Sequence, residues 1–218
     1  MTQIDLDDIA NKVLEVLNSN GTDIVKGSSL NSPHAVGDAV QEFLAGDNGL
    51  ATILKDLCIQ VDNDFTRRSM EDLAFKSGQG NYYAIDVKTH NLNTAFNMPN
   101  LISVKRLAQF YKRSDNNYFC ILIVSYVVES GRIIYKECHF KPIEAFNWDC
   151  LTFGALGWGQ IQIANANILN FHDGKDINRR DWMIKMCDML QFFYDEEIGK
   201  IVERKTWFQE AKTYWKNK

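Results

Sequence analysis

The β-rich run YFCILIVSYVVE at residues 118–129 constrains the fold most, because its many β-branched and aromatic residues favour a strand. Residues 132–140, RIIYKECHF, are also β-rich, and Ser130-Gly131 between the two runs favours a hairpin. A second pair, MEDLAFK and YYAIDVK, flanks the glycine-bearing segment SGQGN. These four segments predict strands of one sheet.

Helices are predicted where apolar residues recur three or four positions apart. Ser32-Pro33 favours a helix start, as an N-cap followed by a first-turn proline, and Pro99 favours another. Asn18 to Gly21 is expected to end the first helix. The helical patterns cover residues 5–17, 32–44, 50–59, 99–111 and the segment from about 178 onwards.

A further β-like run, QIQIANANILNF, occupies residues 160–171, whereas the polar residues 89–97 predict a loop. A chain of 218 residues fits in one domain, and no linker is long enough to divide it. We therefore expect an α+β fold, a central mixed β-sheet flanked by helices, in a single domain over residues 1–218.

Composition indicates an ordinary globular protein, with 45% hydrophobic and 24% charged residues. The chain has neither a long apolar run nor a signal-like start, so a cytoplasmic protein without membrane contact is expected. Its five cysteines lack the spacing of a zinc site and are interpreted as reduced thiols, at positions 58, 120, 138, 150 and 187.

The net charge of −4 argues against a non-specific nucleic-acid coat protein, because binding through phosphates requires clustered lysines and arginines. It does not exclude a DNA enzyme, since metal-binding carboxylates lower the total. Pairs of basic residues can either line a groove or form solvated surface, at 67–68, 105–106, 112–113 and 179–180.

Two acids and a lysine form the candidate chemical site. Asp86 and Lys88 lie two apart in the strand pattern IDVK, so they project from the same face of the sheet. Asp72 lies on the partner strand, and pairing across SGQGN can bring its carboxylate beside that of Asp86. Magnesium takes one or two carboxylates together with phosphate oxygens and waters. The carbonyl of Val87 is a further candidate metal ligand.

Spacing alone is weak evidence for this site, because an acid-x-lysine triplet occurs four times, at 86–88, 173–175, 203–205 and 210–212. Only the first triplet lies on a predicted strand beside an upstream acid. A cross-strand salt bridge on an exposed sheet face explains the same spacing equally well.

A longer block separates the two interpretations. Residues 84–109, AIDVKTHNLNTAFNMPNLISVKRLAQ, resemble the corresponding stretch of blunt-cutting type II restriction endonucleases of the PD-(D/E)xK superfamily, notably in DVKT, PN, IS and LAQ. SPHAVGD at 32–38 and IQI at 161–163 are similar to segments of the same enzymes. The resemblance covers one block well and most of the chain thinly.

This resemblance implies an α/β/α restriction endonuclease-like core, with the roles of two acids and a lysine falling on Asp72, Asp86 and Lys88. It also implies a homodimer that cleaves double-stranded DNA at a short palindromic site, leaving 5′-phosphate and blunt ends. Two Mg²⁺ per active site are expected, with Mn²⁺ as a substitute, and a cognate DNA methyltransferase would act in the same system without direct contact. Glu71 stands where the motif's name has proline, and it competes with Asp72 as metal ligand.

The resemblance further implies that the loop after Lys88 touches bases and inserts a side chain into the duplex. The inserted position aligns with Asn97, although Phe96 or Met98 can replace lost base stacking as well. The asparagine amide can donate to and accept from the edge of adenine. Asparagine is also a common residue in loops. The candidate DNA contacts are Thr89, Asn91, Asn93, Phe96, Asn97 and Asn100, and a second amide cluster comprises Gln160, Gln162, Asn165 and Asn167.

Asp38 and Glu42 share one helical face near His34, where an acid can hold a second magnesium through water. A simpler role in the helix start and a dimer contact remains open for the same group. Two other functions stay open as well: a repair or junction-resolving nuclease of the same fold, and a DNA-binding module with an idle site.

Overall fold

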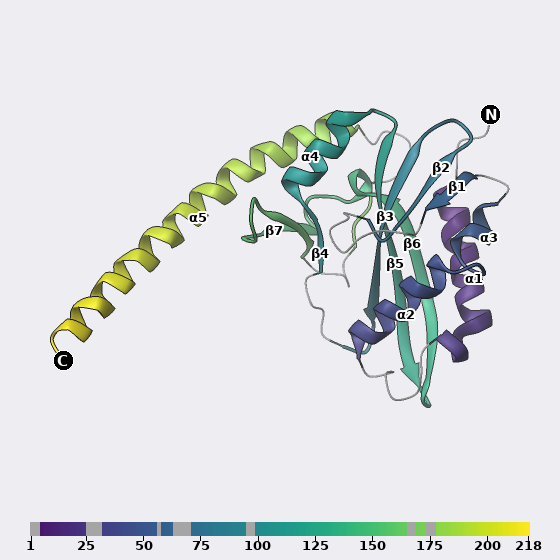
Figure 1. The fold of residues 1–218 in the computed structure, drawn as a ribbon, viewed down its shortest axis with the longest axis horizontal. Coiled ribbons are helices and arrows are strands. Elements are labelled where there is room, and N and C mark those ends of the chain that lie inside the picture. Colours follow the sequence, from purple (N-terminus) through teal and green to yellow (C-terminus); the bar gives the residue numbers. More distant parts are fainter. Residues whose placement is uncertain are drawn as a thin grey trace.

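A computed structural model describes residues 5–24, 32–55, 58–62, 71–94, 99–164, 169–172 and 178–218. Within them the chain forms a five-stranded mixed sheet, a smaller three-stranded sheet and helices on both sides, so the predicted α+β fold is confirmed (Figure 1). No helix in these ranges is long and apolar enough to cross a membrane.

The main sheet has the strand order β1-β2-β3-β5-β6. Only β3 and β5 run parallel, and the other neighbours are antiparallel. Both predicted hairpins are present, with Gly80 and Gly131 at positive φ in their turns, a conformation that glycine adopts without strain. The strands are β1 (Cys58–Asp62), β2 (Leu73–Ser77), β3 (Tyr82–Asn91), β5 (Asn117–Glu129) and β6 (Arg132–Pro142).

One face of the main sheet is covered by three N-terminal helices, α1 (Leu6–Ile24), α2 (Pro33–Ala45) and α3 (Leu50–Leu54) (Figure 1). The predicted start of α2 is confirmed, because Ser32 Oγ accepts a hydrogen bond from the Ala35 N–H at 3.4 Å. Val36, Val40 and Leu44 on α2 are fully buried against this face, together with Ile85 and Val87 of β3. Residues 85 and 87 therefore point away from the other side of the sheet.

The opposite face is covered by α4 (Val104–Arg113), the first half of α5 (Arg179–Lys216) and the small sheet. That sheet has the order β4-β8-β7 and is antiparallel, with strands β4 (Asn100–Ser103), β7 (Leu151–Gly154) and β8 (Gln160–Ile163). Ala84 of β3 and Ile121 of β5 are fully buried on this side. A 3-10 turn, η2 (Ile143–Ala145), follows β6, and Glu144 in it pairs with Arg179 at the start of α5.

The first helix does not end at Asn18 to Gly21, which corrects the prediction. The amide of Asn18 donates to the Tyr135 carbonyl at 3.0 Å and accepts from the Tyr135 N–H at 3.1 Å. Ser19 and Asn20 instead donate to helix carbonyls one turn back. These hydrogen bonds occupy the polar side chains that could otherwise stabilise a turn. The helix therefore continues to Ile24.

Two further boundaries differ from the prediction. Residues 89–91 are not loop but the end of β3, because β5 continues alongside as far as the pair Asn91 and Tyr126. Pro99 does not start a helix; residues 100–103 form β4 against β8, and α4 begins only at Val104. Pairing with a strand 35 positions away decided the first case, and pairing with one about sixty positions away decided the second, and local periodicity reveals neither.

Besides β4, two more strands were not predicted. β1 occupies residues 58–62, of which 58 and 59 were expected to be helical, and it is held by antiparallel pairing with β2. β7 was missed because LTFG is short, and its strand conformation comes from pairing with β8. Cys120, Cys138, Cys150 and Cys187 are free thiols.

Candidate active site

Asp86 lies in the middle of β3 and points to the face of the sheet that carries α4 and the small sheet. Its neighbours Ile85 and Val87 are buried on the opposite side, as strand alternation requires. The carboxylate is nearly fully buried, and Lys88 Nζ lies 2.6 Å from its Oδ1. The predicted pairing of these two side chains on one face is confirmed.

Asp72 lies one residue before β2, directly ahead of the pair Leu73 and Ile85. Continuing that antiparallel register by one step sets Asp72 opposite Asp86. Its Oδ2 accepts a hydrogen bond from the Val87 N–H at 2.8 Å, and its own N–H donates to the Ile85 carbonyl at 2.8 Å. Both bonds fix the carboxylate where β2 ends and β3 continues.

The pKa of the Asp86 carboxyl is raised from its ordinary value of 3.8 to about 7, chiefly by burial and in smaller part by the negative charge of Asp72. Lys88 works in the opposite direction through its charge and its hydrogen bond. Oδ2 of Asp86 is buried and has no hydrogen-bond donor within the described ranges. A buried carboxylate oxygen without a partner is costly, and a bound cation would remove that cost.

Glu71 is held in a different contact. Its Oε1 accepts a hydrogen bond from the Tyr82 hydroxyl at 3.1 Å. Glu71 is not among the residues that line the cleft beside Asp86, whereas Asp72 is. The geometry thus favours Asp72 over Glu71 as the acid that acts together with Asp86.

Asp72 and Asp86 line a cleft of about 450 Å³ between the main sheet and the small sheet. The cleft spans segments that lie far apart in sequence, because β4, α4 and the turn between β7 and β8 form its other walls. Its lining comprises Asp72, Asp86, Leu101, Ile102, Ser103, Arg106, Leu156, Gly157, Trp158 and Gln160. The site is therefore a carboxylate-bearing groove with one arginine in its wall.

The chemistry of this donor set suits magnesium. Two carboxylates, one of them with an oxygen that lacks a partner, match an ion that takes one or two protein carboxylates and otherwise waters. The carbonyl of Val87 lies on the same side of its strand as the N–H that binds Asp72. Among the described residues, no group of three or more His, Cys, Asp or Glu side chains is placed to hold a metal ion.

The predicted DNA contacts are distributed over two regions. Asn100 begins β4, is exposed, and its Oδ1 accepts a hydrogen bond from Gln162 on β8 at 2.6 Å. The structure thus joins one member of each predicted amide cluster at the small sheet. Asn93 is exposed after β3, whereas the Asn91 side chain binds the Asn93 N–H at 3.0 Å and so forms a turn.

Thr89 lies on the opposite side of β3 from Asp86, because its position alternates with Lys88 and its Oγ1 approaches Gly37 of α2. The structure therefore does not bring Thr89 to the cleft. Phe96 and Asn97, together with Met98, Asn165 and Asn167, lie outside the described residues.

Asp38 and Glu42 are not brought to the cleft either. Both are exposed on α2, which packs on the other face of the main sheet. Neither lines the cleft with Asp72 and Asp86. α2 buries Val36 and Val40 on the far side of the sheet, so the structure does not bring these acids to Asp72 and Asp86, and their alternative role in the helix start or a dimer contact stays open.

Sequence reasoning missed the rim of the cleft. Leu156 and Trp158 are largely exposed in the turn between β7 and β8, and Lys105 Nζ lies 4.3 Å from the centre of the Trp158 ring. Arg106 lines the cleft itself. The sequence feature that could have indicated this rim is the apolar pair among glycines in ALGWGQ, residues 155–160. In the structure it lies beside the basic pair at 105–106.

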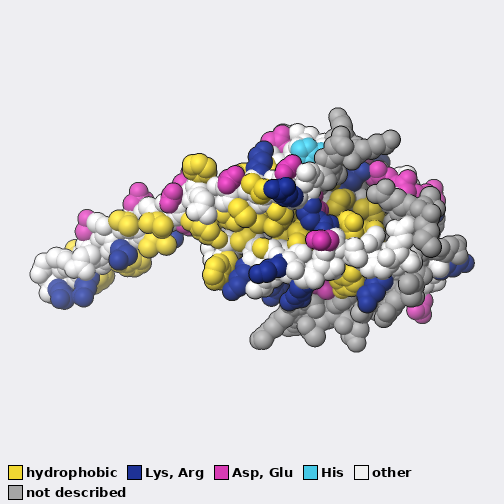
Figure 2. All heavy atoms as spheres, turned by 90° about the horizontal axis from the view of Figure 1, so that it is seen from above, with side chains coloured by type: hydrophobic (Ala, Val, Ile, Leu, Met, Phe, Trp, Pro, Cys, Tyr) yellow, Lys and Arg dark blue, Asp and Glu magenta, His cyan; other side chains and the backbone are white. Residues whose placement is uncertain are grey.

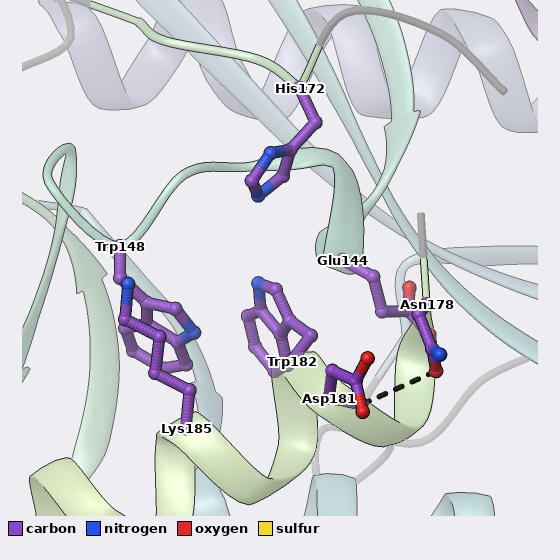
Figure 3. A pocket seen from close by; sticks show the side chains of 7 residues that line it. All are labelled: Glu144, Trp148, His172, Asn178, Asp181, Trp182 and Lys185. Atoms are coloured by element: carbon purple, nitrogen blue, oxygen red, sulfur yellow. Dashed lines mark hydrogen bonds between the residues drawn. The ribbon is translucent and has the colours of Figure 1, made fainter. Parts of the chain in front are cut away.

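A second cavity, of about 230 Å³, lies where α5 meets the body (Figure 3). His172, Trp148 and Trp182 surround it, and Asn178 caps α5 by accepting from the Asp181 N–H at 3.3 Å. Glu144 in its wall is occupied by the Arg179 guanidinium. These contacts serve to attach α5, so we place the candidate active site in the cleft with Asp72 and Asp86.

Neither the comparison with protein-family models nor the comparison with curated proteins returns a match to this sequence. The candidate site accordingly rests on the geometry of its residues.

Proposed function

We propose that this chain is a magnesium-dependent nuclease of the type II restriction class, which hydrolyses both strands of double-stranded DNA at a short palindromic site as a homodimer. The observation that carries the proposal is that Asp72 and Asp86 line the same cleft while Lys88 is bound to Asp86. A mere salt bridge along β3 would need only Asp86 and Lys88. It would not explain why Asp72 lies beside Asp86 in the cleft.

Asp72, Asp86 and the Val87 carbonyl would hold the cation. Magnesium, when bound, supplies positive charge for the phosphate oxygens and makes a bound water more acidic. The chain's own residues provide the rest. Asp86 Oδ1 holds the Lys88 ammonium, whose remaining N–H groups are available to a phosphate oxygen or to the attacking water.

The walls of the cleft fit a polyanionic substrate. Arg106 contributes a fixed positive charge beside the acids, and Lys105 lies at the rim against Trp158. Exposed Leu156 and Trp158 provide apolar surface for a base or sugar. Asn100 and Gln162 offer amide groups on the small sheet for reading base edges.

Incubating plasmid DNA of mixed sequence with the protein and Mg²⁺, followed by sequencing of the ends, tests the proposal. We expect discrete fragments that all end at one symmetric motif and carry 5′-phosphates. Cleavage at branched or damaged sites alone would replace the proposal by a structure-reading nuclease. Specific binding in Ca²⁺ without any cleavage in Mg²⁺ or Mn²⁺ would replace it by an idle binding module.

The Asp86→Asn variant is the matched control for contaminating nucleases. It keeps the side-chain volume but removes the carboxylate. Fragments that persist at the same rate with this variant would show that the activity does not belong to the proposed site.

A further inference from the structure

The second half of α5 stands away from the body of the protein as a single helix (Figure 1). From Asp195 to Lys216 it extends about 33 Å at 1.5 Å per residue. Isolated helices have marginal stability in water, and most helices are stabilised by packing of an apolar face. Many large apolar side chains are nevertheless exposed along this part, namely Ile198, Ile201, Val202, Trp207, Phe208, Tyr214 and Trp215 (Figure 2).

Four of the apolar residues of this arm, residues 194–216, form a stripe with a seven-residue spacing. Tyr194, Ile201, Phe208 and Trp215 are each seven positions apart. Tyr194 is already fixed, because its hydroxyl donates to the Trp158 carbonyl at 2.5 Å. The other three continue the same stripe into solvent. A seven-residue apolar repeat on an α-helix predicts left-handed pairing with another helix.

The surface of the arm has the shape that such pairing needs. A hollow of about 420 Å³ runs along one side of the helix, between Ile201 and Lys212. Ile201, Arg204, Lys205 and Phe208 line it at spacings of three, four and seven, the four-residue arrangement that receives a side chain of a facing helix in a coiled coil. A hollow of this spacing, with apolar Ile201 and Phe208 flanked by Arg204 and Lys205, fits a helical partner.

The distribution of charge along the arm indicates which helix is the partner. The segment nearer the body is acidic, with Asp195, Glu196 and Glu197 in sequence. After Glu210 every charged residue is a lysine, at 212, 216 and 218, and lysines lie at the free end in Figure 2. An antiparallel copy of the same arm would set the acidic segment of each helix beside the lysines of the other.

We propose that the arm is a self-complementary interface, in which α5 packs antiparallel against α5 of a second copy around a two-fold axis. The contact is isologous, so each stripe buries the other. The contact between the acidic segment of one arm and the lysines of the other therefore forms twice. This inference names the surface for the second copy that the proposed function calls for. The test measures the mass of the assembly and not DNA cleavage. The inference therefore fails or succeeds independently of nuclease activity.

Sedimentation equilibrium of the full chain, with helix content from circular dichroism, tests the proposal. We expect a dimer for the parent protein and a Kd at least about 30-fold higher for Phe208→Asp, because a buried interface aromatic is lost. Phe192→Asp is the matched control. Phe192 is a phenylalanine of the same helix, 73% exposed against 66% for Phe208, and lies on the opposite side of α5 from the stripe.

Charge reversal distinguishes antiparallel pairing from a general loss of folding. The double variant Glu196→Lys, Glu197→Lys should weaken the dimer, as should Lys212→Glu, Lys216→Glu. Combining all four reversals should restore the dimer, because attraction between opposite ends returns with inverted signs.

Three outcomes overturn the proposal. A parent chain that is monomeric at 10 to 100 µM, a dimer that persists in Phe208→Asp, or a combined charge variant weaker than either double variant would each refute the interface. Loss of binding to DNA, with an unchanged mass, would assign the arm to nucleic acid instead.

Discussion

Lys88 Nζ lies 2.6 Å from Asp86 Oδ1, whereas Asp86 Oδ2 is buried and lacks a hydrogen-bond donor in the ranges that the structure describes. One oxygen of this carboxylate thus binds an ammonium and the other has no partner, in a residue that lines a cleft together with Asp72. A salt bridge that only stabilised the sheet would gain from satisfying both oxygens. This division between the two oxygens is the feature on which the proposed cation site depends.

We expect Lys88→Ala to lower the rate of DNA cleavage by at least about a hundredfold, because a positive charge beside the reacting phosphate is lost. Specific binding measured in Ca²⁺ should change little. Lys76→Ala is the control, since Lys76 lies exposed on the neighbouring strand β2. Cleavage by Lys88→Ala at the control rate would contradict the role given to Lys88.

Asp72 and Glu71 are expected to behave differently. Asp72→Asn should abolish magnesium-dependent cleavage, because it removes one of the two acids at the cleft. Glu71→Gln should retain cleavage, since the amide can still accept the hydrogen bond from Tyr82. Single-turnover cleavage rates of both variants decide the matter, and the reverse order would transfer the metal-binding role to Glu71.

Stability should depend on pH through Asp86. Because the pKa of Asp86 is raised from 3.8 to about 7 by burial, the folded state holds a proton that the unfolded chain releases. The contribution to stability is complete below about pH 4 and is lost as the pH rises through 7. We expect Asp86→Asn to melt close to the parent protein at pH 5 and above it at pH 8. A melting difference that does not change with pH would refute the raised pKa.

The affinity for magnesium should depend on the protonation of Asp86, since a cation and a proton compete for its carboxylate. Calorimetric titration should show an affinity that rises by up to about tenfold per pH unit between pH 5 and 7 and then levels off. Asp86→Asn provides the control and should lose both the binding and its pH dependence. Equal affinity at pH 5 and pH 8 would argue against a buried Asp86 as ligand.

Arg106 is expected to bind phosphate from the wall of the cleft. Arg106→Ala should weaken binding of all DNA sequences alike and lower the slope of log K against log salt by about one unit. Fluorescence anisotropy at several salt concentrations measures both effects. Arg132→Ala, at the exposed β5–β6 turn, should leave the slope unchanged. A slope that is the same in both variants would remove Arg106 from the interface.

The attachment of α5 depends on a buried ion pair. Arg179 Nε donates to Glu144 Oε1, and the guanidinium lies 4.3 Å from the centre of the Tyr111 ring. Arg179→Ala should lower the free energy of unfolding by about 3 to 5 kcal/mol, because Glu144 would remain buried without its partner. Arg180→Ala, at the exposed neighbouring position, should cost less than about 0.5 kcal/mol in urea denaturation. Equal losses would mean that the pair is not the anchor.

The sequence by itself determined the α+β class, both hairpins, the start of α2 and the common face of Asp86 and Lys88. These features depend on local properties, namely a two-residue alternation, a turn glycine and an N-cap, each of which acts within a few positions.

Only the tertiary structure decided the walls of the cleft and which of Asp72 and Glu71 lines it. Ile102 and Ser103 reach the cleft because residues 160–161 pair with them, and α2 takes Asp38 and Glu42 to the other face because its apolar side must cover the main sheet. Contacts between segments far apart in the chain carry no local pattern. They arise from whichever packing buries the most apolar surface while pairing the backbone, a property of the whole fold.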